Sequence, residues 1–319
     1  MREINISKNE AGQRLDKLLQ KYLDAAPKSF IYKMLRKKNI VLNGSKASGN
    51  EKLEPGDVVK MFLAEETIAR FTKEKTEYVS TNLDIIYEDE KVLLINKPAG
   101  MLSQKAQQAD ISLVEYIIGY LLESGQITTE ELKSFRPSIC NRLDRNTSGL
   151  VVAGKTLYAL QHLGEMFKER KIGKYYRCIV AGQVTKGQRI KGYLIKDPNT
   201  NKVSISEQLK PDSSYIETEY IPLRWGEGIT FLEVHLITGK THQIRAHLSS
   251  VGHGIIGDYK YGNTEINDRY KQQYGVQHQL LHAYRLQVKV WEGKMSGIAK
   301  KEFIAPLPGS WDKILKEME

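Results

Sequence analysis

Residues 139–156 read ICNRLDRNTSGLVVAGKT, and this stretch says most about how the chain folds. A charged cluster, Arg142, Asp144 and Arg145, runs through a turn-prone Asn-Thr-Ser-Gly into the apolar, β-branched run 150–153. Such a run is typical of a buried strand, and a loop held by a rigid strand is a common place for catalytic groups. An arginine beside a carboxylate favours its charged form, which suits a nucleophile or base and equally suits a structural ion pair. The local residues leave both roles open for Asp144.

Residues 149–156 also match the GxxxxGK[ST] pattern of phosphate-binding loops letter for letter. A phosphate-binding loop needs a flexible backbone whose amides converge, whereas the middle residues here, Leu-Val-Val-Ala, prefer a strand. No acidic strand-end partner for magnesium is evident either. We therefore interpret the match as fortuitous and expect Gly154-Lys155-Thr156 to open a helix, with Thr156 as its N-cap.

The composition narrows the possible partners and surroundings. The 319 residues allow about two domains, and the net charge of +10 favours an anionic partner, nucleic acid before a membrane surface, over a merely soluble basic protein. The two cysteines have no metal-binding or disulfide spacing, which predicts a reducing, cytoplasmic setting. No stretch has the pattern of a signal peptide or the roughly 18 apolar residues of a membrane helix.

Residues 1–63 have the pattern of a small domain that binds RNA. Two amphipathic helices are expected near 14–24 and from 29 onward, followed by strands around an Asn43-Gly44 hairpin turn. The segment resembles the S-four-type RNA-binding domain in Arg14-Leu-Asp16, Ser29, Lys33, Val41-Leu-Asn-Gly44 and Gly56-Asp57.

The outer face of the second helix carries cations and almost no acids, which favours phosphate contacts over a merely solvated surface. The residues of this domain predicted to bind RNA are Arg14, Ser29, Lys33, Arg36, Lys37 and Lys38.

Residues 64–82 are polar and without strong periodicity, which predicts a linker, and residues 83–319 form a second domain. Ser112-x-x-Glu115 has the pattern of a capping box that opens a helix. From Lys174 onward, strands follow one another without intervening helices, which predicts a largely antiparallel mixed sheet flanked by helices, hence an α+β fold.

Thr238-Gly-Lys-Thr-His-Gln-Ile-Arg-Ala-His247 joins a long strand to a helix for which Thr241 is the expected N-cap. The free amides of the first turn, with Lys240 and Arg245, predict an anion site for a phosphate or for Asp144. A metal site at the histidines is disfavoured, since His242 and His247 are five residues apart and so lie on different helix faces.

Tyr175 and Tyr176 follow each other on a predicted strand and so point to opposite faces. One can line a pocket as a stacking platform for a base, and the alternative is that both pack in the core.

Residues 83–308 resemble the catalytic domain of RluA-type RNA pseudouridine synthases, through several motifs in the family's order. These are Ile85-Ile-Tyr-Glu-Asp-Glu90 with Asn96-Lys-Pro-Ala-Gly100, Arg142-Leu-Asp144-Arg-Asn-Thr-Ser-Gly149-Leu, Lys174-x-Tyr176 through Gly182, the Thr238–His247 motif with Gly257-Asp258 and Tyr261-Gly262, and Leu281-His-Ala-Tyr.

The resemblance implies a cofactor-free isomerase that converts uridine to pseudouridine in RNA. It further implies that Asp144 is the catalytic aspartate, that Tyr176 packs against the target base and that Arg245 pairs with Asp144. Arg142 would position the flipped nucleotide or its backbone. The third motif contributes the predicted RNA contacts Lys240, His242 and Gln243.

The N-terminal module makes the chain most similar to the RluC and RluD branches, which implies structured 23S (large-subunit) ribosomal RNA as the substrate and a monomeric, metal-free enzyme. Two alternatives are a transfer-RNA-directed synthase and a non-catalytic RNA-binding or ribosome-assembly factor. The target uridine must leave the stack before its glycosidic bond is reached. The sequence does not choose between attack by Asp144 on the sugar, attack on the base and removal of a sugar proton.

Overall fold

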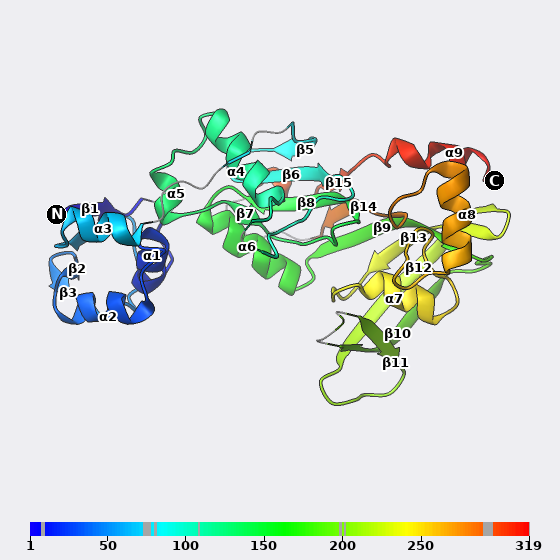
Figure 1. The fold of residues 1–319 in the computed structure, drawn as a ribbon, viewed down its shortest axis with the longest axis horizontal. Helices are drawn as coiled ribbons and strands as arrows, with labels where there is room; N and C mark the ends of the chain where they lie inside the picture. The colour runs from blue at the N-terminus through cyan, green and yellow to red at the C-terminus, as the bar shows by residue number, and fades with distance from the viewer. Residues whose placement is uncertain are drawn as a thin grey trace.

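The structure is a computed structural model that describes residues 1–7, 10–72, 78–79, 82–107, 109–197, 200, 202–289 and 296–318. Residues 73–77, 80 and 81 of the predicted linker lie outside these residues, as does residue 290, where a strand beginning at Leu281 was expected to end. Two β-sheets, each with a hydrophobic core of its own, occupy different parts of an elongated molecule (Figure 1).

The N-terminal sheet has the order β1-β4-β2-β3 and is covered by two helices. Its elements are β1 (Arg2–Asn5), α1 (Leu15–Tyr22), α2 (Lys28–Arg36), β2 (Ile40–Leu42), β3 (Ser45–Lys46) and β4 (Val58–Met61). Asn43 and Gly44 join β2 to β3 with φ angles of 51° and 76°, the left-handed pair that a two-residue hairpin turn requires. The predicted turn is therefore confirmed.

Helix α3 (Glu65–Phe71) lies within the predicted linker but packs on the N-terminal core. Ile68 is buried there, and the ring of Phe71 lies 4.5 Å from that of Phe30. The N-terminal core thus extends beyond residue 63, because one apolar face of a short helix is enough to join it. The sequence did not predict this packing, because the other face of α3 is polar and the apolar periodicity is weak.

The large sheet has the order β11-β10-β12-β13-β9-β14-β8-β6-β5 within the described residues, with β15 beside β14 and β7 beside β8. Its strands are β5 (Ile85–Glu88), β6 (Val92–Lys97), β7 (Ser138–Ile139), β8 (Ser148–Gly154), β9 (Ile172–Ala181), β10 (Gln188–Lys196), β11 (Val203–Ser206), β12 (Ser214–Gly226), β13 (Ile229–Leu236), β14 (Leu281–Val288) and β15 (Glu302–Ile304). The β8–β14 pair is parallel and the other pairs of this sheet are antiparallel. The predicted α+β fold with a largely antiparallel mixed sheet is confirmed.

The helices of this part lie on both faces of the sheet. They are α4 (Leu113–Glu123), α5 (Glu131–Ser134), α6 (Leu157–Lys168), α7 (Gln243–Ser250), α8 (Thr264–Tyr274) and α9 (Asp312–Lys316). Helices α4 and α7 share one apolar cluster with β9 and β13, whereas α6 packs with β15 on another and α8 with α9 on a third. In the described residues, no helix has the length and apolar character that crossing a membrane requires.

Two of the three helix N-termini predicted from capping residues are found in the structure. The Ser112–Glu115 capping box is present, and the Thr156 hydroxyl accepts a hydrogen bond from the Ala159 amide at 3.1 Å, as predicted. The expected cap at Thr241 is wrong: α7 begins at Gln243, and His242 occupies the N-cap with a left-handed φ of 54°.

Strand β8 is buried along its whole length, and β14 approaches its start closely. A Cβ atom at Gly149 would lie 2.3 Å from the Ala283 carbonyl oxygen, and Gly149 has a φ of 110°. Glycine is required at this point because the two parallel backbones nearly touch. This contact lies directly after the Asp144 loop and anchors it to the centre of the sheet.

Candidate active site

A cleft of about 1110 Å³ opens over the β9–β13 side of the large sheet. Its wall is formed by the loop before β8, the end of α6, strand β9, the start of β12 and the turn before α7. The cleft brings together every site residue predicted in the second domain, namely Arg142, Asp144, Tyr176, Lys240, His242, Gln243 and Arg245.

The loop that carries Asp144 is held by hydrogen bonds on both sides of the carboxylate. Ser103 donates to the Leu143 carbonyl at 2.7 Å and accepts from the Leu143 amide at 3.1 Å. The Thr147 amide donates to the Asp144 carbonyl at 3.0 Å, which closes a turn, and Gln279 donates to the Thr147 hydroxyl at 3.1 Å. The backbone at Asp144 is therefore fixed before any substrate binds.

Lys97 supports the same loop from below. Its side chain is fully buried, and its ammonium donates to the carbonyls of Pro98, Met101 and Arg145 at 2.8, 2.9 and 3.1 Å. Burial lowers the pKa of Lys97 to about 7, and the charge of Asp144 opposes this shift. One lysine thus ties the loop after β6 to the loop that carries Asp144.

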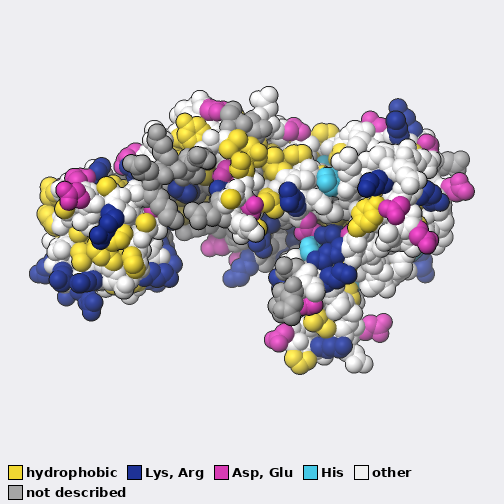
Figure 2. All heavy atoms as spheres, in the orientation of Figure 1, with side chains coloured by type: hydrophobic (Ala, Val, Ile, Leu, Met, Phe, Trp, Pro, Cys, Tyr) yellow, Lys and Arg dark blue, Asp and Glu magenta, His cyan; other side chains and the backbone are white. Residues whose placement is uncertain are grey.

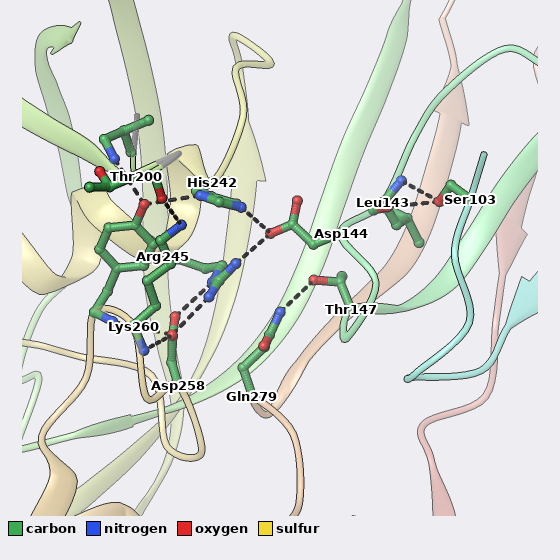
Figure 3. A network of polar contacts seen from close by, with 12 residues as sticks. Ser103, Leu143, Asp144, Thr147, Thr200, His242, Arg245, Asp258, Lys260 and Gln279 are labelled. Carbon is green, nitrogen blue, oxygen red and sulfur yellow. Dashed lines mark hydrogen bonds and ion pairs between the residues drawn. The ribbon is translucent and has the colours of Figure 1, made fainter. Parts of the chain in front are cut away.

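Arg245 links Asp144 to a second carboxylate (Figure 3). Its Nη1 donates to Asp144 Oδ2 at 2.8 Å, while Nε and Nη2 donate to the two oxygens of Asp258 at 2.7 and 2.8 Å. Burial disfavours the charge of Arg245, but the hydrogen bonds and charges of Asp258 and Asp144 outweigh it and raise the pKa of Arg245. The guanidinium is a fixed cation that orients one oxygen of Asp144 and leaves the other free of it.

The arginines next to Asp144 in the sequence do not pair with it. Arg142 is exposed on the cleft wall, and Arg145 donates to the Gly100 carbonyl at 3.1 Å. The expectation of a carboxylate between two neighbouring guanidiniums is therefore wrong. Side chains at successive loop positions point in different directions, and the partner of Asp144 comes from α7.

Tyr176 and His242 complete the surroundings of Asp144. Tyr176 is buried against the cleft, and burial, together with the charge of Asp144, raises the pKa of its hydroxyl. His242 Nε2 lies 3.9 Å from Asp144 Oδ2, and its Nδ1 lies 3.0 Å from the Tyr261 hydroxyl. Burial lowers the pKa of His242, so at neutral pH it serves as a neutral hydrogen-bonding group. Tyr175, on the opposite face, stacks on His235 with 4.5 Å between the ring centroids.

Gln243 lines the cleft, but its amide is used within the protein. Its oxygen accepts from the Thr238 hydroxyl and the Lys240 amide, and its nitrogen donates to the Glu217 carbonyl and the Thr218 hydroxyl. These four bonds occupy the hydrogen-bonding positions of the amide. We therefore correct the predicted RNA contact: Gln243 shapes the turn that presents Lys240, which is exposed.

The predicted RNA-binding residues of the small domain lie on α2 and beside α1, at the other end of the molecule from α7 (Figure 1). Arg14 pairs with Asp16 at 2.9 Å. The rest are exposed, and Figure 2 shows basic side chains gathered on this part of the surface. These residues are Ser29, Lys33, Arg36, Lys37 and Lys38.

The described residues contain no cluster of three or more histidine, cysteine or acidic side chains that could hold a metal ion. His247 instead lies 3.0 Å from the Thr218 hydroxyl, and His253 lies 3.2 Å from the Ala181 carbonyl. The cleft thus contains one carboxylate oriented by an arginine, the buried ring of Tyr176 and several cations.

Residues 91–250 match the family model described as RNA pseudouridylate synthase. The chain belongs to the RNA pseudouridylate synthase family. Pseudouridine synthases are isomerases, and Asp144 and Arg245 both lie within the matched range.

Curated relatives cover nearly the whole chain. The chain is 30% identical to the ribosomal large subunit pseudouridine synthase C of Vibrio cholerae over 99% of its own length and 96% of that of the relative. It is 31% identical to the protein of the same name from Vibrio parahaemolyticus, over 98% and 95% of the two chains.

Two solved structures share the fold of this synthase. Human RNA pseudouridylate synthase domain containing 4 has a TM-score of 0.58 and 19% identity, and covers 74% of this chain and 93% of its own. Human RNA pseudouridylate synthase domain containing 1 has a TM-score of 0.52 and 21% identity, and covers 74% and 94%.

Two residues of this synthase were given no role by the sequence. Asp258 was noted only as part of Gly257-Asp258, and nothing local marks it as the second partner of Arg245. Lys97 is the last residue of the largely apolar strand β6, and a lysine in that position is a usable signal for a buried, hydrogen-bonded ammonium.

Proposed function

We propose that this protein isomerises specific uridines of 23S ribosomal RNA to pseudouridine, with Asp144 as the catalytic carboxylate. The observation that carries the proposal is the geometry of Asp144, which is held by Arg245 at 2.8 Å inside a cleft walled by Tyr176. The names of the Vibrio relatives support the large ribosomal subunit as the source of the substrate.

The isomerisation balances without any added reagent. The bond between N1 of uracil and C1′ of ribose breaks, the freed uracil turns, and a C5–C1′ bond forms. The proton on C5 is then lost, and N1 gains one. Asp144 either attacks the sugar or the base or removes a sugar proton, and all three steps need an ionised carboxylate at the flipped nucleotide.

The other residues of the cleft bind the base, orient Asp144 or contact the rest of the nucleotide. The ring of Tyr176 packs against the loose base and excludes water. Arg245 donates to one oxygen of Asp144 and so fixes the orientation of the carboxylate. Arg142, Lys240 and His242 face the nucleotide or its backbone, because all three line the cleft with polar groups.

The N-terminal domain adds affinity through the phosphates that α2 contacts and contributes little sequence information. We propose that it is an S-four-type RNA-binding domain and that the protein acts in the cytoplasm as a monomer. The cleft is complete within one chain, which supports a monomer. The reaction as written requires no cofactor.

The test uses two unmodified transcripts, one of large-subunit ribosomal RNA and one pool of transfer RNAs. Each is incubated with the purified full-length chain, and pseudouridine is mapped by carbodiimide-dependent reverse-transcription stops. We expect defined stops in the ribosomal transcript. Stops confined to transfer RNA would favour the transfer-RNA alternative, and no stops in either would refute synthase activity.

Asp144→Asn keeps the size of the side chain and removes its negative charge. We expect this variant to bind RNA as the wild type does and to lose activity by at least about a thousandfold. The matched control is Asp268→Asn, because Asp268 is an exposed acceptor for Tyr259 and an amide oxygen retains that bond. Wild-type turnover by Asp144→Asn would rule out the proposed catalytic role.

A further inference from the structure

One wall of the cleft is lined by five cations, of which only Lys240 has been given a role above. Lys168 is the last residue of α6, and Arg170 follows this helix. Lys174 comes from β9, Lys196 from the end of β10 and Lys240 from the turn before α7. Four of the five are exposed, as expected for solvated charges, whereas Lys174 is partly buried. Burying a cation costs free energy unless an anion or hydrogen-bond acceptor compensates for the lost water.

Lys174 and Tyr176 share a face of the sheet. They are two residues apart on β9, and side chains at that spacing point the same way about 7 Å apart. A Cβ atom at Gly239 would lie 2.8 Å from Lys174 Nζ. The ammonium therefore reaches across the cleft wall to the turn that leads into α7, and a glycine leaves it the room.

Lys174 has no partner among the residues that the structure describes. No carboxylate lies within ion-pairing distance of its Nζ, and no hydrogen bond to it is present in that part of the chain. The contrast with other buried lysines is clear: Lys97 donates to three carbonyls, and Lys155 pairs with Glu88 at 2.8 Å. Burial, with the nearby charge of Arg170, lowers the pKa of Lys174 to about 8.

A lysine with only a packing role extends its ammonium to water along the nearest route. Lys174 instead sits among Arg170, Lys168 and Lys240 in a wall of positive charge. An anion placed there would receive a partly desolvated ammonium and long-range attraction from its neighbours. The positive charge of this wall therefore favours an anionic ligand.

We propose that Lys174 is a positioning residue that binds the RNA phosphate next to the target nucleotide, while Tyr176 contacts the base of that nucleotide. This inference rests on the proposed function. The base and the flanking phosphate of one flipped nucleotide extend in different directions from the sugar. Tyr176 and Lys174, two residues apart on the same face of β9, can therefore contact one each. The phosphate contact would set how deeply the sugar approaches Asp144.

The test is a phosphate scan on a synthetic RNA hairpin that contains the mapped target uridine. One phosphate at a time is replaced by a neutral methylphosphonate, and KM and kcat for pseudouridine formation are measured. We expect wild-type KM to rise about tenfold at one flanking linkage, the size of one charge-assisted hydrogen bond. Lys174→Gln should raise KM about tenfold on unmodified RNA and show no further loss at that linkage.

The matched control is Lys171→Gln, because Lys171 lies three residues away, is exposed and pairs with Glu169 at 2.7 Å. It should retain the wild-type response to every linkage. Gly239→Ala provides a second variant that leaves the lysine in place: its methyl group displaces Nζ and should raise KM in the wild-type background but not together with Lys174→Gln. This variant decides the matter if Lys174→Gln does not fold.

The proposal is overturned if Lys174→Gln keeps the wild-type KM, or if it remains as sensitive as the wild type to every methylphosphonate. A loss in kcat alone, with no linkage specificity, would also overturn it, since that pattern indicates a general disturbance of the cleft. If the wild type forms no pseudouridine in any RNA, the proposed function fails instead, so the two failures are distinguishable.

Discussion

The guanidinium of Arg245 and the cations on the outer face of α2 lie in opposite physical settings, and we propose that both act on a negatively charged substrate. Arg245 is 8% exposed and makes charged hydrogen bonds to Asp144 and Asp258. Lys33, Arg36 and Lys37 are exposed, and no salt bridge to them is present in the part of the chain that the structure describes. A buried, paired cation fixes geometry, whereas exposed cations supply affinity.

The two settings also differ in how they respond to salt. Exposed charges are screened within about 8 Å at physiological ionic strength, whereas buried pairs are screened much less. Changes at Arg245 should therefore alter turnover at any salt concentration, and changes on α2 should alter binding in a way that depends on salt. Three predictions test this contrast, beginning with the largest expected effect.

Arg245→Gln removes the cation between two carboxylates. We expect kcat to fall about 100- to 1000-fold, since Asp144 loses its orienting partner, and stability to fall by about 3–5 kcal/mol, since Asp258 stays buried without its partner. Single-turnover kinetics and urea unfolding measure the two effects. Wild-type kcat in Arg245→Gln would contradict the role given to this residue.

The companion variant is Asp258→Asn, which leaves the Arg245–Asp144 contact in place but weakens the support behind it. Asp258 is buried and does not line the cleft, so RNA binding should stay unchanged while kcat decreases. A lowered affinity with unchanged kcat would mean that Asp258 acts on the RNA and not through Arg245.

Lys97→Met tests the support under the Asp144 loop. Three buried carbonyls lose their donor, which should cost about 1–3 kcal/mol of stability at neutral pH. The pKa of Lys97 is about 7 in the folded state against a model value of 10.5. Between these values the unfolded chain holds more protons than the folded one, so this lysine makes stability rise with pH.

This increase in stability with pH is caused by the titration of Lys97, so it should be absent from Lys97→Met. Urea unfolding of both proteins at about pH 7 and about pH 9.5 measures it, and the advantage of the wild type over the variant should grow with pH. Parallel pH profiles for the two proteins would show that Lys97 does not titrate in the way its burial predicts.

Neutralising the exposed face of α2 should have the smallest effect on catalysis. The variant replaces Lys33, Arg36, Lys37 and Lys38 with glutamine. We expect RNA affinity to fall roughly tenfold at low salt and the salt dependence to flatten by about 0.7–0.9 log units per lost phosphate contact, with kcat unchanged at saturating RNA. Filter binding across a salt series measures both quantities.

The control carries the same change in charge on the exposed surface of α8 and α9, namely Arg269, Lys271, Lys313 and Lys316 replaced with glutamine. It should bind RNA more tightly than the α2 variant. Equal binding by the two variants would mean that α2 acts only through net charge. If the α2 variant binds RNA as tightly as the wild type, the cations of α2 are solvated side chains that do not contact RNA.

Local features of the fold were accessible from the sequence because they depend on residues close together in the chain. The Asn43-Gly44 turn, the Ser112–Glu115 capping box and the buried run of β8 all follow from backbone preference and short-range periodicity. Helix α8 was missed although Asn263 caps its start and Gly275 ends it, since its mostly polar sequence gives a weak apolar stripe.

The active site depends on contacts that no local pattern contains. Arg245 and Asp144 are 101 residues apart. The residues around Arg245 predicted an anion site that could take a phosphate or Asp144, and only the family resemblance chose Asp144. The sequence instead placed Arg142 and Arg145 next to the carboxylate, yet Arg145 donates to the Gly100 carbonyl and Asp144 pairs with Arg245.

The sequence by itself thus predicted the strands and most helix starts, and it led us to propose a two-part organisation and the residues that carry the chemistry. Only the tertiary structure decided which cation holds Asp144, that Lys97 is satisfied by three carbonyls and that Lys174 has no partner among the described residues. The physical reason is that secondary structure is set within a few residues of chain, whereas electrostatic pairing and desolvation depend on which distant segments the sheet brings together.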